Sequence, residues 1–406
     1  MRKSLLYILL LLLMLPAIGM GAETKRERTN RNLAPLVRFG AKLDDIFQRG
    51  MDTSYIGFPE HSWQLEVATG TIGIHSTFWS DNVFERTLGN MTLKLQTTPS
   101  ASLGFQAGYR TLGFGYSWDL IHAYSRNWNF AIGSKSIGLE LMRQETNNLH
   151  GDLTMPASGT HIHLHPDTFA QSITSTTLNV YYVLNAKHYS HNAAIKQNYI
   201  QRKTAGSLLL QVNYMNTQID LDPQTSKYVS NVNGIETHQV GVGLGYGINY
   251  TPNQGKLLFH LSGIAQLVCL SHNLVSIYDS ISIHRTGEAD TTMWLYSLYR
   301  INARQPVHVV GTMRAAISWE INEWVHIRTW AQVNNVRFLS AAYNTNITLS
   351  NWNWQVNLAV GVRFGFGKKR TREILGDPIA PELCPEVEDK PKLPKWLTDY
   401  FFSSPF

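Results

Sequence analysis

The sequence predicts an all-β protein, an antiparallel transmembrane β-barrel of about 12 strands within a range of roughly 10 to 14. Three observations support this: a secretory signal at the N-terminus, long segments in which apolar and polar residues alternate, and a pattern of short and long connections. Alternation is the main signal, because a barrel strand in lipid turns apolar side chains outward and polar or small ones toward the lumen.

Residues 1–22 predict a cleaved signal peptide. Two basic residues precede an apolar run from Leu5 to Leu15, and small residues follow up to Ala22, which is the layout of a secretory signal. The run is shorter than the roughly 20 residues that a membrane-spanning helix needs. We therefore expect an exported chain that is integral to the outer membrane of a Gram-negative cell envelope.

Alternation is clearest in two segments of the predicted barrel, which covers residues 61–366. From Asn351 to Phe366 every second residue is apolar, over a length that soluble strands rarely reach. From Gln239 to Tyr250 four glycines lie on the inward face, which indicates close packing against that wall. The remaining predicted strands are 63–78, 88–96, 102–109, 111–119, 135–143, 172–184, 205–220, 256–271, 307–321 and 324–340.

The connections agree with these strands at most positions, because bacterial barrels have short periplasmic turns, longer outer loops and both termini inside. Two links disagree. The turn at Arg110 and Thr111 is short where an outer loop is expected, and 185–204 is long where a periplasmic turn is expected. Either the strand set is wrong locally or these links have a special role, such as plugging the barrel. A soluble β-sandwich is the runner-up fold.

The segments outside the barrel differ from it in composition. In the periplasmic N-terminal segment 23–60, residues 33–48 have the spacing of a short amphipathic helix. The periplasmic C-terminal tail 367–406 is proline-rich and unsuited to strands. Cys269 should lie toward the outer face and Cys384 in this tail, so we expect no disulfide between them.

The closing strand, Gly361–Phe366, resembles the C-terminal insertion signal of outer-membrane barrels, which implies recognition by the barrel-assembly machinery. That signal ordinarily ends a chain, whereas here the tail follows it. From Asp52–Ile56 onward, and most clearly over Lys187–Leu210, the chain resembles an uncharacterised Bacteroidota outer-membrane β-barrel family, domain of unknown function 4421. The resemblance covers roughly residues 45–366 and implies a barrel without an assigned reaction, so it carries over no catalytic residues.

Several charged or ionisable side chains fall on the inward face of the predicted strands and form a lumen polar cluster. They could pair with one another and fill the lumen, or line an anion-selective path. A filled lumen is the better interpretation, since about twelve strands make a narrower barrel than those of the open porins. The cluster consists of Glu140, His260, Arg314, Glu320, His326, Arg328 and Arg363.

Two further groups of residues could carry chemistry. His161, His163 and His165 alternate, so in an extended segment their imidazoles would point one way and could bind a transition metal. The stretch from His188 to Asn192 contains Ser190 between imidazoles, the parts of a serine hydrolase site. It resembles outer-membrane phospholipase A loosely, although that enzyme's serine and histidine lie on the lipid-facing side.

The function that fits these observations is that of a non-enzymatic narrow channel, scaffold or surface module in contact with outer-membrane lipids. The alternative is an outer-membrane lipid-acting hydrolase of the phospholipase or lipid A deacylase type. We expect no cofactor. The formal net charge of +6 comes without a nucleic-acid-binding motif, so no nucleic-acid partner is expected. The transported solute and the oligomeric state stay open.

Overall fold

The structure is a computed structural model that describes residues 50–82, 91–97, 101–120, 125–147, 149–165, 171–228, 232–286, 290–303, 307–342 and 345–365. The predicted signal peptide, the helix predicted at 33–48, the C-terminal tail and Cys384 lie outside the described residues. Within the described ranges, no helix is both long enough and apolar enough to cross a membrane.

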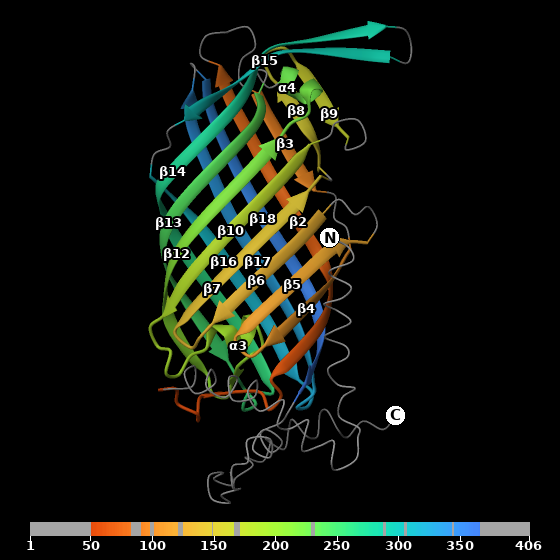
Figure 1. Cartoon of the computed structure of the whole chain (residues 1–406). Helices are drawn as coiled ribbons and strands as arrows, with labels where there is room; N and C mark the ends of the chain where they lie inside the picture. Colours follow the sequence, from red (N-terminus) through yellow and green to blue (C-terminus); the bar gives the residue numbers. More distant parts are fainter. Residues whose placement is uncertain are drawn as a thin grey trace, which may run out of the picture. The chain divides into compact units, whose positions relative to one another are not determined.

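Twelve antiparallel strands form a closed barrel, in which the last strand pairs with the first along its whole length (Figure 1). Closure gives hydrogen-bond partners to the backbone groups of the first and last wall strands, which would lie unpaired at the two edges of an open sheet. The wall strands are β2 (Trp63–Asn82), β4 (Ser102–Tyr109), β5 (Leu112–Asp119), β6 (Ser125–Gly133), β7 (Ile137–Thr146), β10 (Ser172–Val183), β12 (Ala205–Asp220), β13 (Val232–Tyr250), β14 (Leu257–Thr286), β16 (His308–Glu320), β17 (Val325–Ala342) and β18 (Thr345–Phe364).

The two ends of the barrel carry different additions. We call the end where β2 begins and β18 ends the proximal end, and the other the distal end. At the proximal end lie the helix α3 (His191–Ile195) and a two-residue pairing of β1 (Ile56–Gly57) with β11 (Ile200–Gln201). The distal end carries β3 (Met91–Thr97), β8 (Leu149–Met155), β9 (Thr160–Leu164), α4 (Pro223–Tyr228) and β15 (Asp290–Ala303), as Figure 1 shows.

The strand set differs from the sequence prediction in one exchange. The segment predicted at 88–96 corresponds to β3, which pairs with the distal part of β2 and with β8 but not with β4. The wall instead contains β6, which the prediction omitted. With this exchange, Tyr109 pairs with Trp63, so the short turn at Arg110 lies at the proximal end and fits the pattern of short turns there.

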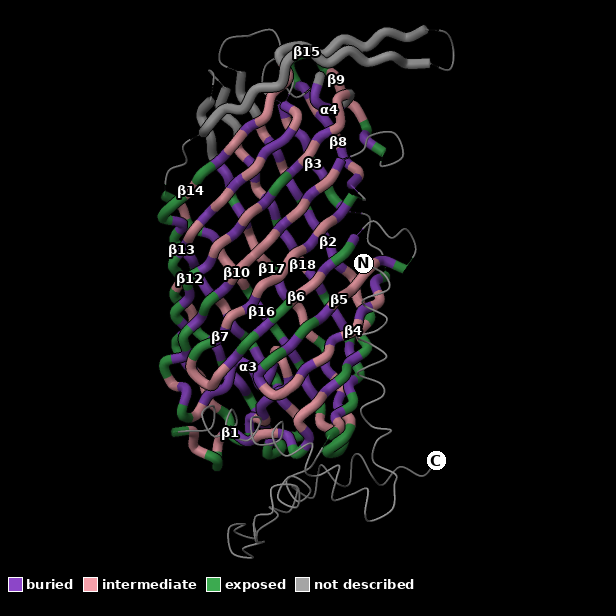
Figure 2. The backbone as a smooth tube through the Cα atoms, viewed as in Figure 1, coloured by how far each residue is buried: buried purple, intermediate pink, exposed green. Residues whose placement is uncertain are grey.

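The long wall strands have an apolar outer face and a buried inner face, as the alternating colours of Figure 2 show. On β18, Trp352, Val356 and Leu358 are exposed while the asparagines and the glutamine between them are buried. Exposed aliphatic side chains continue around the wall on β12, β13, β14 and β16. This outer belt is the reverse of a soluble protein's arrangement and matches a wall that faces lipid.

The distal interior is filled by an apolar core. Phe338 of β17 pairs with Leu349 of β18, and Leu349 pairs with Phe78 of β2, so all three side chains lie at one level of the lumen. The extra strands β3, β8 and β9 add leucines to the same core. The core consists of Ile74, Phe78, Met91, Leu93, Leu95, Leu149, Leu153, Met155, Leu164, Ile173, Ile219, Leu221, Val232, Ile235, Val275, Phe338 and Leu349.

Below this core lies a layer of uncharged polar side chains that hydrogen-bond across neighbouring strands. Ser76 Oγ donates to Asn351 Oδ1 at 2.9 Å, and Gln211 Nε2 donates to Asn179 Oδ1 at 2.7 Å. Buried polar groups need such partners, because an unmet hydrogen bond costs about 1–3 kcal/mol. Such polar side chains continue down to the charged proximal lumen, where Asn179 pairs with Glu140 of the neighbouring strand.

The glycine-rich wall of β13 is contacted by the segment that follows β10. A Cβ atom added at Gly247 would lie 2.2 Å from Tyr189 Oη, and the Tyr189 side chain is fully buried. Gly247 therefore makes room for the inserted Tyr189 side chain, in agreement with the close packing that the sequence indicates.

We expect Gly247→Ala to lower the urea midpoint of unfolding, because overpacking a buried contact costs about 1–3 kcal/mol. Gly263→Ala, on the neighbouring strand β14, is the matched control, since no atom lies within 4 Å of its added Cβ. Equal midpoints for the two variants would mean that Tyr189 can shift without loss of stability, so that its packing does not require a glycine at position 247.

Candidate functional site

Residues 184–204, which we call the plug, connect β10 to β12 and enter the proximal lumen. The segment is tied to the wall as it leaves the sheet, because Leu184 N donates to Leu208 O and Asn185 N donates to Ser207 Oγ. It then forms the short helix α3, whose residues His191 to Ala194 are all buried. The long link that disagreed with the connection pattern is thus a folded insert.

The helix α3 begins and ends with side-chain hydrogen bonds. Ser190 is its N-cap, and Ser190 Oγ accepts a hydrogen bond from Ala193 N. Beyond the helix, Gln197 has a positive φ of 56°, a conformation that is uncommon for residues other than glycine. The Gln197 amide holds this turn in place by donating to Ala193 O at 2.7 Å and to Ser318 Oγ of β16 at 2.6 Å.

Wall residues satisfy the carbonyl groups that the end of α3 leaves without helical partners. Arg328 of β17 donates to Ile195 O, and Gln64 of β2 donates to Lys196 O at 2.6 Å. Arg363 of β18 donates to Gln197 O at 3.2 Å. Three consecutive plug carbonyls therefore bind three different wall strands, and two of the three donors are cations, which a helix C-terminus favours.

The first of three buried ion-pair groups joins β2 and β17. Glu66 lies between His326 and Arg328: Glu66 Oε1 is 2.9 Å from His326 Nε2, and the other carboxylate oxygen pairs with the Arg328 guanidinium. Gln106 of β4 accepts a further hydrogen bond from Arg328 at 3.0 Å. Glu66, His326 and Arg328 are at most 2% exposed, so the carboxylate and the guanidinium compensate one another away from water.

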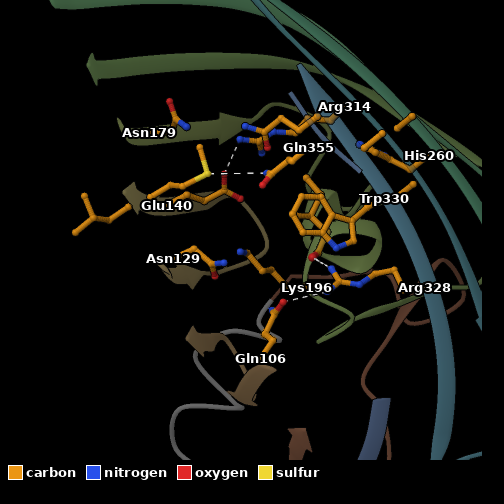
Figure 3. Close-up of a pocket in the computed structure, with 17 residues that line it drawn as sticks. Gln106, Asn129, Glu140, Asn179, Lys196, His260, Arg314, Arg328, Trp330 and Gln355 are labelled. Carbon is orange, nitrogen blue, oxygen red and sulfur yellow. Dashed lines mark hydrogen bonds and ion pairs between the residues drawn. The ribbon is translucent and has the colours of Figure 1, made fainter. Parts of the chain in front are cut away.

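Two further groups complete the charged layer. Arg314 of β16 pairs with Glu140 of β7 at 2.7 Å, and the Lys196 side chain extends from the plug into the same region (Figure 3). Arg363 pairs with Glu320 while also binding the plug through Gln197. The layer therefore joins opposite walls to the plug rather than lining a free path.

The structure places all seven residues of the predicted lumen polar cluster in the proximal lumen, six of them buried and Glu320 partly exposed. His260 is held by Asn249 Oδ1 at 2.7 Å and Ser262 Oγ at 3.0 Å. Sequence reasoning missed Glu66, although the same alternation along 63–78 places it inward between Leu65 and Val67. It also missed Lys196, because no strand period applies to the plug.

The residues of the hydrolase alternative lie in the plug and are not arranged for catalysis in this structure. The Ser190 hydroxyl is occupied as the N-cap, and none of the hydrogen bonds within the described ranges joins it to an imidazole. His191 Nδ1 instead lies 3.1 Å from Tyr189 Oη. His188 Nδ1 lies 3.2 Å from Asn185 Oδ1.

His191 is a neutral packing group. Burial lowers its pKa to about 3, and the nearby positive charges of Arg314 and Lys196 act in the same direction. The ring contacts those of Tyr181 and His260, with centroids 5.0 Å and 5.2 Å away. A group with this pKa stays unprotonated at neutral pH and is a poor proton acceptor there.

The alternating histidines lie at the distal end, far from the plug along the barrel. His161, His163 and His165 are exposed on and just beyond β9. His163 Nδ1 is 2.7 Å from Asp152 Oδ1 of β8, and the rings of His163 and His165 are 4.7 Å apart. In the part of the chain that the structure describes, no three or more potential ligand side chains are grouped to hold a metal ion. Metal binding stays a prediction from sequence spacing.

Comparison with known proteins identifies the family. A family model for a domain of unknown function, DUF4421, matches residues 51–364. The chain belongs to this family. The resemblance found in the sequence is thereby confirmed, while the Bacteroidota origin stays a prediction. Among curated proteins, no sequence matches the chain.

The DUF4421 chain is similar to several solved barrels at low identity. The outer membrane protease OmpT from Escherichia coli is 11% identical, with a TM-score of 0.37, and the match covers 77% of this chain and 100% of that one. The translocator domain of the autotransporter NalP from Neisseria meningitidis is 9% identical, with a TM-score of 0.31, covering 82% of this chain and 97% of that one. Likeness at this level says nothing about activity.

We expect Glu66→Gln to destabilise the barrel by about 3–5 kcal/mol, because it leaves the buried Arg328 without its anionic partner. The measurement is urea unfolding in detergent micelles, followed by tryptophan fluorescence. Glu323→Gln, in the exposed turn before β17, is the control and should change little.

A second variant separates charge compensation from packing. Glu66→Gln combined with Arg328→Met removes both charges, so it should recover part of the lost stability. If the double variant were less stable than Glu66→Gln alone, the hydrogen bonds of Arg328 to Ile195 and Gln106 would outweigh charge compensation at this site.

Proposed function

We propose that the chain is an integral outer-membrane β-barrel that works without an open pore, as a non-enzymatic scaffold that carries the distal β-structure at the cell surface. The observation that supports this most directly is a lumen filled at both ends. The plug occupies the proximal end, where hydrogen bonds from wall residues hold it, and the apolar core fills the distal end.

The outer belt has the height of a membrane's hydrocarbon layer. On β18 the outward side chains from Trp352 to Phe364 are apolar. At about 3.3 Å per residue they cover about 40 Å of strand, or about 30 Å for a strand tilted by about 40°. Aromatic contacts mark the proximal edge, where the ring centroids of Trp63 and Tyr109 are 4.6 Å apart, as in the interfacial girdles of barrels.

The distal strands extend well beyond this belt. β2 and β18 each have 20 residues, and β14 has 30, whereas crossing a bilayer takes about 9–11. The excess forms a water-facing extension with its own apolar core. In the proposed orientation the proximal end is periplasmic, the outer lipids surround the belt, and the extension projects from the cell.

The location can be tested by fractionation of a cell that produces the full chain. We expect recovery in the outer membrane and a change of gel mobility on heating, because closed barrels resist detergent until they are heated. Protease added to intact cells should cleave the distal extension and spare the plug. Recovery in the soluble periplasm would overturn the proposed location.

The absence of an open pore can be tested in planar bilayers. We expect no stepwise conductance from the intact protein, nor from a variant in which residues 188–202 are replaced by a short Gly-Ser linker, because the distal core seals the lumen independently. An open porin reconstituted in parallel is the positive control. Conductance from the intact protein would contradict the scaffold proposal, and conductance from the linker variant alone would make the plug a gate.

A further inference from the structure

A small cavity lies between the plug and the wall in the proximal lumen. Its volume is about 50 Å³, and its lining includes Gln106, Glu140, Lys196, Arg314 and Arg328. Figure 3 shows these side chains reaching into it from different strands and from the plug. Since a water molecule needs about 10–15 Å³ of such space, the cavity has room for a monatomic ion with one or two waters.

The charged groups around the cavity do not balance. Three arginines each have one carboxylate partner, in the pairs Arg314–Glu140, Arg328–Glu66 and Arg363–Glu320. Lys196 is the fourth cation of the layer, and its ammonium group forms no ion pair with any of the described residues. Glu140 and Glu66 attract the Lys196 ammonium, but each of them already pairs with an arginine. One positive charge of the layer is therefore in excess, and burying it favours a counterion or the loss of a proton.

The cavity also presents hydrogen-bond donors without acceptors. Nε of Arg314 and Nε2 of Gln106 are buried and have no hydrogen-bond partner among the described residues, and each of the two residues is 8% exposed. On the acceptor side, Glu140 Oε1 and Asn129 Oδ1 are likewise without a partner. Water next to an anion could donate to these two oxygens, while the anion accepts from the cationic donors.

We propose that this cavity binds one halide-sized monovalent anion, held by the ammonium of Lys196 and the guanidinium of Arg314. The anion balances the fourth cation and bridges the plug to β16, so it is part of the seal at the proximal end. Chloride is the physiological ion of this class. This inference goes beyond the proposed scaffold function and does not depend on it, since an anion could be held in the same way in a gated barrel.

Two other occupants would also meet the charge and hydrogen-bonding requirements of this cavity. Burial lowers the pKa of Lys196, so the side chain could lose its proton and leave the cavity to water alone. A larger oxyanion such as sulfate would need more space than the cavity offers beside Glu140.

The test is a crystal structure of the purified protein grown in sodium bromide, with data collected at the bromine absorption edge. We expect an anomalous peak in the cavity within hydrogen-bonding distance of Lys196 Nζ. The peak should be lost in Lys196→Met, which keeps the side-chain length and leaves the Lys196 carbonyl free to accept from Gln64. It should persist in Lys256→Met, a control that removes an exposed lysine from the same end of the barrel.

Thermal unfolding gives a second readout for the same variants. The unfolding midpoint of the wild type should rise when sodium gluconate is replaced by sodium chloride, because an ion that binds only the folded state stabilises it. Lys196→Met should lose this rise, and Lys256→Met should keep it. A wild-type cavity without a bromide peak, or a peak unchanged in Lys196→Met, would overturn the proposal. If Lys196→Met failed to fold, the wild-type peak alone would decide.

Discussion

The proximal half of this barrel depends on hydrogen bonds between buried arginines of the wall and carbonyl groups of the plug that have no helical partner. The guanidinium groups of Arg328 and Arg363 point into a lumen where bulk water is excluded, and the end of α3 leaves carbonyls without helical donors. Burying either set alone would be costly. Together they fix the position of the plug at the level of the charged layer.

The two ends of the lumen are filled by different chemistry, and the reason lies in the size of the barrel. Small barrels of about eight strands can be filled by their own side chains, whereas a wider one leaves space at its centre. At the distal end, the added strands β3, β8 and β9 supply leucines and two methionines to the centre. At the proximal end the plug supplies Tyr189, and Gly247 of β13 gives its side chain room. The wall sequence and the inserted segment are thus complementary.

Much of this architecture could be predicted from the sequence. A wall strand with an apolar outer face and a polar inner face alternates apolar and polar residues, and the loops do not share this period of two. That period identified eleven of the twelve wall strands and placed residues such as Arg314 and His326 inward. It could also have found β6, where Trp128, Phe130 and Ile132 alternate with asparagines and alanine. The miss came from counting 88–96 as a wall strand, since β3 has the same alternation but pairs only with the distal part of β2 and with β8, outside the closed wall.

The interior of the plug could not be predicted in the same way. Which carbonyl meets which arginine depends on a turn at Gln197 with positive φ, and no periodicity signals such a turn. The inward position of Lys196 likewise depends on how the plug folds, so it could not be assigned from strand periodicity. Ser190 is the N-cap of the short buried helix and His191 packs within it, whereas His188 lies before the helix, against Tyr55 and Asp52.

The pairing of the lumen charges bears on function more directly than their number. Charges that line a conducting path are left free to meet a passing ion, yet here three arginines and three carboxylates pair one to one and two of the arginines also bind the plug. Moving an ion through this layer would require breaking buried pairs, each at a cost of several kcal/mol. These one-to-one ion pairs therefore favour the proposed filled barrel over an anion path lined by the same residues.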